Sequence, residues 1–170
     1  MTGFPDGPFH RRTARVLLVN GEDRLLLFKF YGNRKKNPDR FYWLTPGGGV
    51  DEGEPLHHAA ARELREETGL VVAPDELGGL IALTGGYADL GWAKGDFRED
   101  FYFHRIVRHE VDLSGLEDYE HEQLVEHRWW SVDELATTED RVYPLELAPL
   151  VSRLIAGDIP AEPVLLPWHH

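Results

Sequence analysis

Three glutamates of one predicted helix, Glu63, Glu66 and Glu67, could together bind a metal ion. At 100° per residue, Glu63 and Glu67 lie one turn apart, and Glu66 lies on the flank of the same stripe. Like charges at this spacing destabilise a helix by roughly 0.2–0.5 kcal/mol. Ala59 and Val71, not cations, occupy the next helical positions on this line. A solvated acidic face usually interleaves Lys or Arg, so the stripe favours a site for a hard divalent cation, which prefers oxygen ligands.

The residues around this stripe predict where the helix begins and ends, and a glycine-rich segment precedes it. Pro55 stands at the predicted start, where a missing N–H does no harm, and Gly69 follows the run and can close it in the left-handed conformation. Three consecutive glycines, residues 47–49, precede the helix and allow the backbone to approach a ligand closely. Arg62 lies one turn before Glu66, so its guanidinium can hold that carboxylate from the side.

The segment from Gly48 to Leu70 resembles the Nudix box, G-x5-E-x7-R-E-U-x-E-E-x-G-U with U aliphatic, at every specified position. The matching residues are Gly48, Glu54 and the run 62–70. The resemblance implies the Nudix fold, an α+β architecture in which a mixed β-sheet lies between helices as an α/β/α sandwich. It also implies hydrolysis of a phosphoanhydride bond in a nucleoside diphosphate linked to another group X.

The same resemblance implies a Mg²⁺ or Mn²⁺ cofactor and a set of ligands for it. Glu66 and Glu67 are the main ligands that it implies, and the carbonyl of Gly47 contributes to the same site. Glu63 is implied either as a further ligand or as the general base. A carboxylate cluster holding such a cation supplies an activated water and neutralises charge on the phosphoryl oxygens.

The general base has two candidate positions, because members of the family differ in where it lies. It is either Glu63 in the box or a residue of the loop before the last strand, which offers Glu120 and Glu122; Glu122 is our first choice there. A solvated acid in an acid-rich loop is the alternative interpretation of Glu122. Arg62 is expected to orient Glu63, and Glu54 to support the cluster from outside the metal ligands.

A polar segment over residues 31–40, reading YGNRKKNPDR, carries candidate contacts to substrate phosphates. Its cations are Arg34, Lys35, Lys36 and Arg40, and of these Arg34, Lys35 and Arg40 are the candidates for hydrogen bonds with phosphate oxygens. The alternative is the solvated tip of a hairpin. Since specificity lies in such loops, the box itself leaves the nucleotide substrate open.

A second candidate for substrate contact is the predicted glycine-rich loop over residues 85–95, which carries Tyr87 and Trp92. Either ring could stack on a nucleobase, although a tryptophan in a loop can equally anchor packing. Tyr87 also lies seventeen positions after Leu70, near the distance at which Nudix enzymes similar to dinucleoside polyphosphate hydrolases carry a tyrosine.

The length and composition predict one soluble domain, and the resemblance implies a small nucleotide as its partner. The 170 residues suffice for a real core, and the absence of cysteine excludes disulfides, thiolate metal sites and a cysteine nucleophile. A net charge of −12 argues against binding nucleic acid, and no apolar run reaches the ~20 residues of a membrane span. We therefore expect a cytoplasmic protein without nucleic-acid or membrane partners, and leave a homodimer open.

The pattern of apolar runs and turns predicts the order of elements. Expected strands cover residues 15–20, 24–30, 41–44, 76–84, 97–107 and 124–130, with a polar link over 111–126. Ser131 and Glu134 form a capping box at the start of a helix, and residues 144–156 predict a last helix. We expect an irregular lead-in over 1–9, the Nudix domain over 10–157 and a proline-containing extended tail over 158–170.

Two other functions compete with hydrolysis. A non-catalytic Nudix domain could bind a nucleotide ligand as a sensor, although an intact box favours catalysis. The isomerase branch of the same fold acts on isoprenoid diphosphates and uses a cysteine, which this chain lacks; we set it aside.

Overall fold

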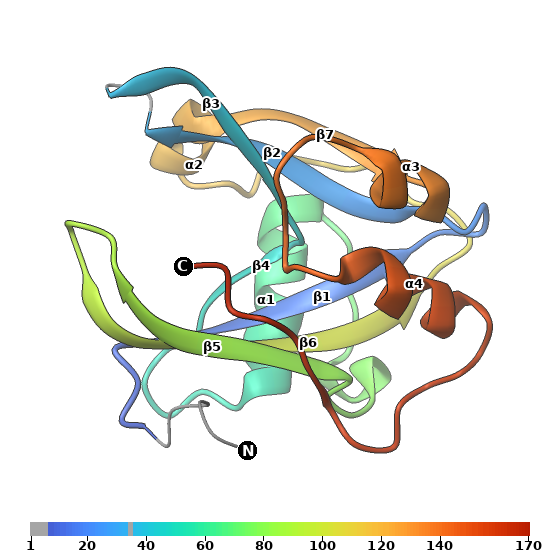
Figure 1. Ribbon diagram of the computed structural model, residues 1–170. Coiled ribbons are helices and arrows are strands. Elements are labelled where there is room, and N and C mark those ends of the chain that lie inside the picture. The colour runs from blue at the N-terminus through green and yellow to red at the C-terminus, as the bar shows by residue number, and fades with distance from the viewer. Residues whose placement is uncertain (1–6, 34–35) are drawn as a thin grey trace.

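A computed structural model describes residues 7–33 and 36–170 of the chain (Figure 1). In this part of the chain nine strands form one mixed sheet. The strands are β1 (Arg11–Val19), β2 (Leu25–Asn33), β3 (Asn37–Leu44), β4 (Gly47–Gly49), β5 (Ala82–Asp89), β6 (Lys94–Arg105), β7 (Leu124–Trp130), β8 (Val142–Tyr143) and β9 (Val164–Leu165). The helices are α1 (Leu56–Thr68), η1 (Pro74–Leu77, 3₁₀), α2 (Asp118–Gln123), α3 (Val132–Thr137) and α4 (Leu147–Ile155). No helix among the described residues is long and apolar enough to cross a membrane.

The sheet divides into two halves that meet at the end of β1. β1 runs parallel to β6 from the pair Arg11↔Phe97 to the pair Val19↔Arg105, whereas it pairs with β2 only at Val19↔Leu25. One half therefore contains β2, β3, β7 and β8, and the other contains β1, β4, β5, β6 and β9. Figure 1 shows β2, β3 and β7 above β1, β5 and β6, with the two halves diverging away from their junction.

Helices cover both faces of this sheet, and the side chains of β1 point alternately into a hydrophobic core on each face. Leu17 and Val19 pack into a cluster with Val151 and Leu154 of α4. Val16 and Leu18 point the other way, into a cluster that includes Ala60 and Leu64 of α1. Burial of apolar side chains on both faces of a strand requires a layer on each side. The α+β sandwich expected from the sequence is confirmed.

Two predictions between the box and β6 are wrong. Residues 76–84 do not form one strand, because Pro74–Leu77 is a 3₁₀ helix and β5 begins only at Ala82. Residues 85–95 are not a loop; they are mostly the strands of the β5–β6 hairpin. Glycine is depleted in strands, but Gly86 has a packing reason, since a Cβ there would lie 2.4 Å from Cδ1 of Trp168.

Other boundaries also shift. The segment 31–40 consists largely of the ends of β2 and β3, and the link 111–126 contains α2. The Ser131–Glu134 capping box is confirmed. The last helix begins at Leu147, which places Pro149 in the first turn, where it interrupts no hydrogen-bond ladder.

The segment over residues 158–170 packs against the sheet. β9 pairs in parallel with β5, and Leu166 is buried in the core that α4 covers. The Thr84 hydroxyl donates to the carbonyls of Leu166 and Pro167 at 3.0 and 3.1 Å. The chain then runs back between the two halves of the sheet, where the red end lies in Figure 1.

Candidate active site

The helix α1 places two of the three glutamates on its buried face. It begins after Pro55 and ends at Gly69, whose φ of 75° is left-handed and whose N–H donates to the Arg65 carbonyl at 2.8 Å. Glu63 and Glu67 are each only 8% exposed and share this face with Leu64. Two of the three glutamates of the predicted stripe therefore occupy the side that a helix normally gives to apolar residues, whereas Glu66 is partly exposed.

Arg62 lies at the centre of the acidic cluster. Its guanidinium donates to both oxygens of Glu54 at 2.9 Å, to Oε1 of Glu63 at 2.9 Å and to the Gly49 carbonyl at 2.9 Å. The bond to Oε2 of Glu66 is longer, 3.4 Å. The Arg62 hydrogen bonds lower the pKa of Glu54, and bonds to the same carboxylates raise that of Arg62. Arg62 thus orients Glu63 and Glu54 more tightly than Glu66.

The glycines before the helix hold the other side of the cluster. The Gly47 N–H donates to Oε2 of Glu67 at 2.8 Å. At Gly48 a Cβ would lie 2.6 Å from Cδ of Glu63, so only glycine leaves room for that carboxylate. The sequence interpretation assigned the Gly47 carbonyl to a metal; this role stays a prediction, whereas the structure shows what the Gly47 N–H does.

Burial makes the charged forms of the two inner glutamates costly. It raises the pKa of Glu67 well above its ordinary value, against the opposing hydrogen bond from Gly47. It also raises the pKa of Glu63, although Arg62 opposes the shift. Arg15 of β1 adds a positive charge near Glu67. A positive charge placed among these oxygens would offset the cost of burying two carboxylates.

The donor chemistry of this cluster fits Mg²⁺ or Mn²⁺, which prefer carboxylate and carbonyl oxygens. Each ionised carboxylate has about four lone-pair positions, and the bonds from Arg62 and Gly47 engage only part of those on Glu63 and Glu67. Among the described residues, no three acidic or histidine side chains stand ready in a metal-binding arrangement. Because Arg62 donates to Glu63 and Glu66, a cation would compete with its guanidinium for these oxygens.

The helix α2 brings a further acid to the cluster. The charge of Glu120 raises the pKa of both Glu63 and Glu67, and Glu120 is half-buried with its Oε1 accepting from the Tyr119 hydroxyl at 3.1 Å. Glu122, our first choice from the sequence, is exposed on the same short helix. Its assignment as base stays a prediction, and Glu120 is the acid of α2 that acts electrostatically on the box.

A cleft of about 600 Å³ lies beside the cluster, between the two halves of the sheet. Arginines and aromatic rings dominate its wall, and Glu99 is the acid among the described residues that line it. The arginines come from β1, β3, β6 and the loop before β8: Arg11, Arg15, Arg40, Arg98 and Arg141. Although the whole chain has a net charge of −12, most of the charged residues that line this cleft are cations. Binding of phosphates requires such a local positive charge.

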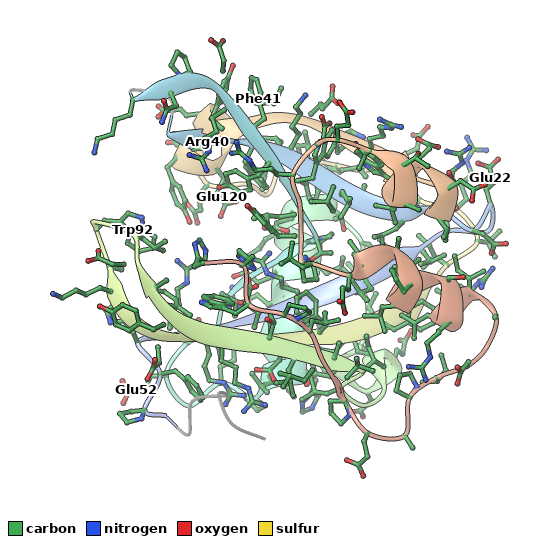
Figure 2. All side chains as sticks on the ribbon, viewed as in Figure 1. Glu22, Arg40, Phe41, Glu52, Trp92 and Glu120 are labelled. Atoms are coloured by element: carbon green, nitrogen blue, oxygen red, sulfur yellow. The ribbon has the colours of Figure 1, made fainter. Side chains whose placement is uncertain are left out.

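The predicted substrate contacts divide three ways. Arg40 and Trp92 line the cleft, from β3 and from the β5–β6 hairpin on the two halves of the sheet (Figure 2). The Tyr87 side chain is 59% exposed and does not line it. Arg34 and Lys35 lie outside the described residues.

Sequence reasoning missed Arg15, which joins the cleft to the glutamates. Its Nε donates to Oε1 of Glu99 at 2.7 Å and its NH1 to the Thr45 carbonyl at 2.9 Å. Burial disfavours its charged form, but Glu99 outweighs this and raises the pKa. The same side chain lines the cleft and interacts with Glu67. The arginine that opens the apolar run RVLLV was the available signal.

A comparison with protein families shows the family of the chain. A family model described as "NUDIX domain" matches residues 9–151. The chain belongs to the Nudix family. The RNA pyrophosphohydrolase of Caulobacter vibrioides (strain NA1000 / CB15N) is 33% identical over 146 residues, which cover 76% of each chain.

Solved Nudix structures share the fold. The MutT protein from Methanosarcina mazei Go1 superposes with a TM-score of 0.61 at 22% identity, covering 91% of this chain and 98% of its own. An Ap4A hydrolase of C. elegans gives a TM-score of 0.56 at 18% identity, covering 86% and 96%. The predicted Nudix fold is confirmed. This Nudix pyrophosphohydrolase hydrolyses a pyrophosphate bond in a nucleoside diphosphate linked to another group.

Gly48→Ala should lower kcat about a hundredfold, because a catalytic group displaced by 1 Å can cost that much. The new Cβ would meet the Glu63 carboxylate at 2.6 Å and push it out of the cluster. Gly79→Ala is the matched control, since a Cβ there meets nothing within 4 Å. Steady-state kinetics beside circular dichroism measure the effect; equal kcat values for the two variants would contradict the packing of Glu63 against Gly48.

Proposed function

We propose that this Nudix pyrophosphohydrolase acts on free nucleotides with Mg²⁺ or Mn²⁺ as its cofactor. The observation that carries the proposal is the position of Arg15, which lines the cationic cleft and interacts electrostatically with Glu67 of the cluster. A nucleotide whose phosphates lie along Arg15 would place its pyrophosphate beside the glutamates and its nucleoside in the cleft. The aromatic lining of the cleft supports binding of a nucleoside there.

The side chains divide the work between binding and chemistry. Glu63, Glu66 and Glu67, with the carbonyl of Gly47, would hold the cation, which supplies an activated water and neutralises charge on the phosphoryl oxygens. Arg62 fixes the orientation of Glu63 through the bond at 2.9 Å. Bidentate arginine contacts bind phosphate oxygens strongly, and the cleft offers Arg11 and Arg40 for this role.

RNA bearing a 5′ pyrophosphate is the second candidate substrate, because the relative from Caulobacter vibrioides is an RNA pyrophosphohydrolase. The net charge of −12 opposes it, since binding a polyanion generally requires a basic surface beyond the reacting group. Free nucleotides require positive charge only within the cleft.

A substrate panel tests the proposal. Nucleoside triphosphates, dinucleoside polyphosphates, ADP-ribose and 5′-triphosphorylated RNA are incubated with Mg²⁺, with Mn²⁺ or with EDTA, and released phosphate and monophosphate are measured. We expect metal-dependent turnover of at least one free nucleotide at a kcat/KM above that for RNA. A preference for RNA would overturn the choice of substrate. Tight binding of one compound without any turnover would establish the sensor instead.

Glu120→Gln should lower kcat more than Glu122→Gln does. The charge of Glu120 acts on Glu63 and Glu67, and removing a general base typically costs about 10²–10⁴-fold. Rates measured with both variants on the best panel substrate distinguish the candidates. A larger loss in Glu122→Gln would restore the assignment made from the sequence, and unchanged rates in both would return the role to Glu63.

A further inference from the structure

A continuous row of rings crosses the cleft from one half of the sheet to the other. Phe97 of β6 lies 6.4 Å from Trp168 between ring centroids, at an interplanar angle of 19°. Trp168 lies 4.7 Å from His169. His169 in turn stacks on Tyr143 of β8 at 4.2 Å and 19°. All four residues line the cleft.

The two central rings belong to a segment that is firmly anchored. The N–H of Leu166 donates to the Leu83 carbonyl at 2.8 Å, and the Thr84 hydroxyl donates to the carbonyls of Leu166 and Pro167. The Trp168 indole N–H donates to the Tyr87 carbonyl at 2.9 Å. Gly86 provides the space for that indole, because any Cβ there would overlap it.

The segment forms a wall of the cleft and does not fill it. With Trp168 and His169 in place the cleft still has about 600 Å³, within the range of roughly 300–1,000 Å³ typical of small-molecule sites. Nδ1 of His169 is buried and has no hydrogen-bond partner among the described residues. Because Nδ1 is closed off from solvent, a hydrogen bond from His169 to a ligand in the cleft would have to come from the other ring nitrogen, Nε2.

We infer that Trp168 and His169 contact the base of the nucleotide substrate and so determine which nucleotides this enzyme accepts. The inference rests on the proposed function, because it assigns the nucleoside part of the substrate to the cleft. Stacking on the indole would supply affinity for any base, and the imidazole beside it would discriminate between base edges. The phosphate end lies toward Arg15 and the glutamates.

Binding of product-like ligands without metal tests this assignment independently of hydrolysis. AMP and ribose 5-phosphate, which lacks the base, are titrated calorimetrically into the wild type and into Trp168→Ala and His169→Ala. We expect Trp168→Ala to raise the Kd for AMP about tenfold, as loss of one stacked base does, and to leave that for ribose 5-phosphate unchanged. Ile159→Ala, an exposed residue of the same C-terminal stretch outside the cleft lining, serves as the control.

Gly86→Ala provides a second route to the same result. It displaces the indole without removing a side chain from the cleft wall, so it should weaken AMP binding as Trp168→Ala does, and the double variant should be no worse than either. With the best panel substrate, these variants should raise KM and leave kcat within about twofold, whereas a merely structural defect would also lower kcat.

Each outcome separates the inference from the proposed function. A wild type that hydrolyses nucleotides, with Kd for AMP unaltered in Trp168→Ala, His169→Ala and Gly86→Ala, would overturn the inference alone. Equal weakening of AMP and ribose 5-phosphate would also overturn it, because the rings would then not contact the base. A wild type that binds AMP through Trp168 and hydrolyses nothing would support the inference and refute the proposed function.

Discussion

Replacing Glu66 and Glu67 together by glutamine is expected to abolish hydrolysis while the protein stays folded. Glutamine keeps the shape of each side chain but removes the negative charges that would bind the cation. Because metal assistance provides several kcal/mol of transition-state stabilisation, kcat should fall by at least about a thousandfold. Glu67 is buried with a raised pKa, so its neutral replacement should not lower the melting temperature.

Glu52→Gln is the matched control for this experiment. Glu52 is an exposed acid of the loop before α1 and lies at the edge of the molecule in Figure 2, away from Glu120. We expect wild-type kinetics from it in assays with Mg²⁺ and with Mn²⁺. Full activity in the double variant, with a native circular dichroism spectrum, would refute the assignment of the metal site to this cluster.

Arg62→Lys should lower kcat about 10–100-fold, as loss of the partners that orient metal ligands typically does. Lysine keeps the charge but lacks the planar fork that donates to Glu54, Glu63 and the Gly49 carbonyl at once. Arg62→Ala should be less active still and less stable, since it leaves partly buried carboxylates unpaired at about 1–3 kcal/mol each.

Arg65→Lys is the matched control, because it also replaces an arginine of α1 by lysine but at an exposed position. Titration of activity with Mn²⁺ gives the readout that distinguishes orientation from packing: Arg62→Lys should require a higher metal concentration for half-maximal rate. An unchanged metal requirement together with a lower melting temperature would assign Arg62 a purely structural role.

The helix with the glutamates could be predicted from the sequence because all its determinants are local. Pro55 starts it, Gly69 ends it, and the acids lie within two turns of one another. The prediction that the three adjacent glycines form a loop was wrong, because residues 47–49 form the strand β4, which pairs with β1. Gly48 does lie close to the Glu63 carboxylate, whereas the approach of this backbone to a ligand stays a prediction.

The cleft could not be predicted because its residues meet through long-range pairing. Arg15 reaches Glu99 across 84 positions only because β1 lies parallel to β6, and parallel neighbours leave no local signal in a sequence. Gly86 was interpreted as part of a loop, whereas its lack of a side chain serves the indole of Trp168. The alternating pattern of Phe97–Val107 predicted β6 but not the strand that would lie beside it.

The division of the sheet has a consequence for how such an enzyme changes during evolution. The glutamates rest on a helix bound to the core through Ala60 and Leu64, whereas Trp92 and Arg40 come from hairpins at the diverging ends of the two halves. Selection can therefore exchange residues in these hairpins without disturbing the core beneath the reacting bond. A lineage could acquire new metabolites as substrates while its hydrolytic chemistry stays the same.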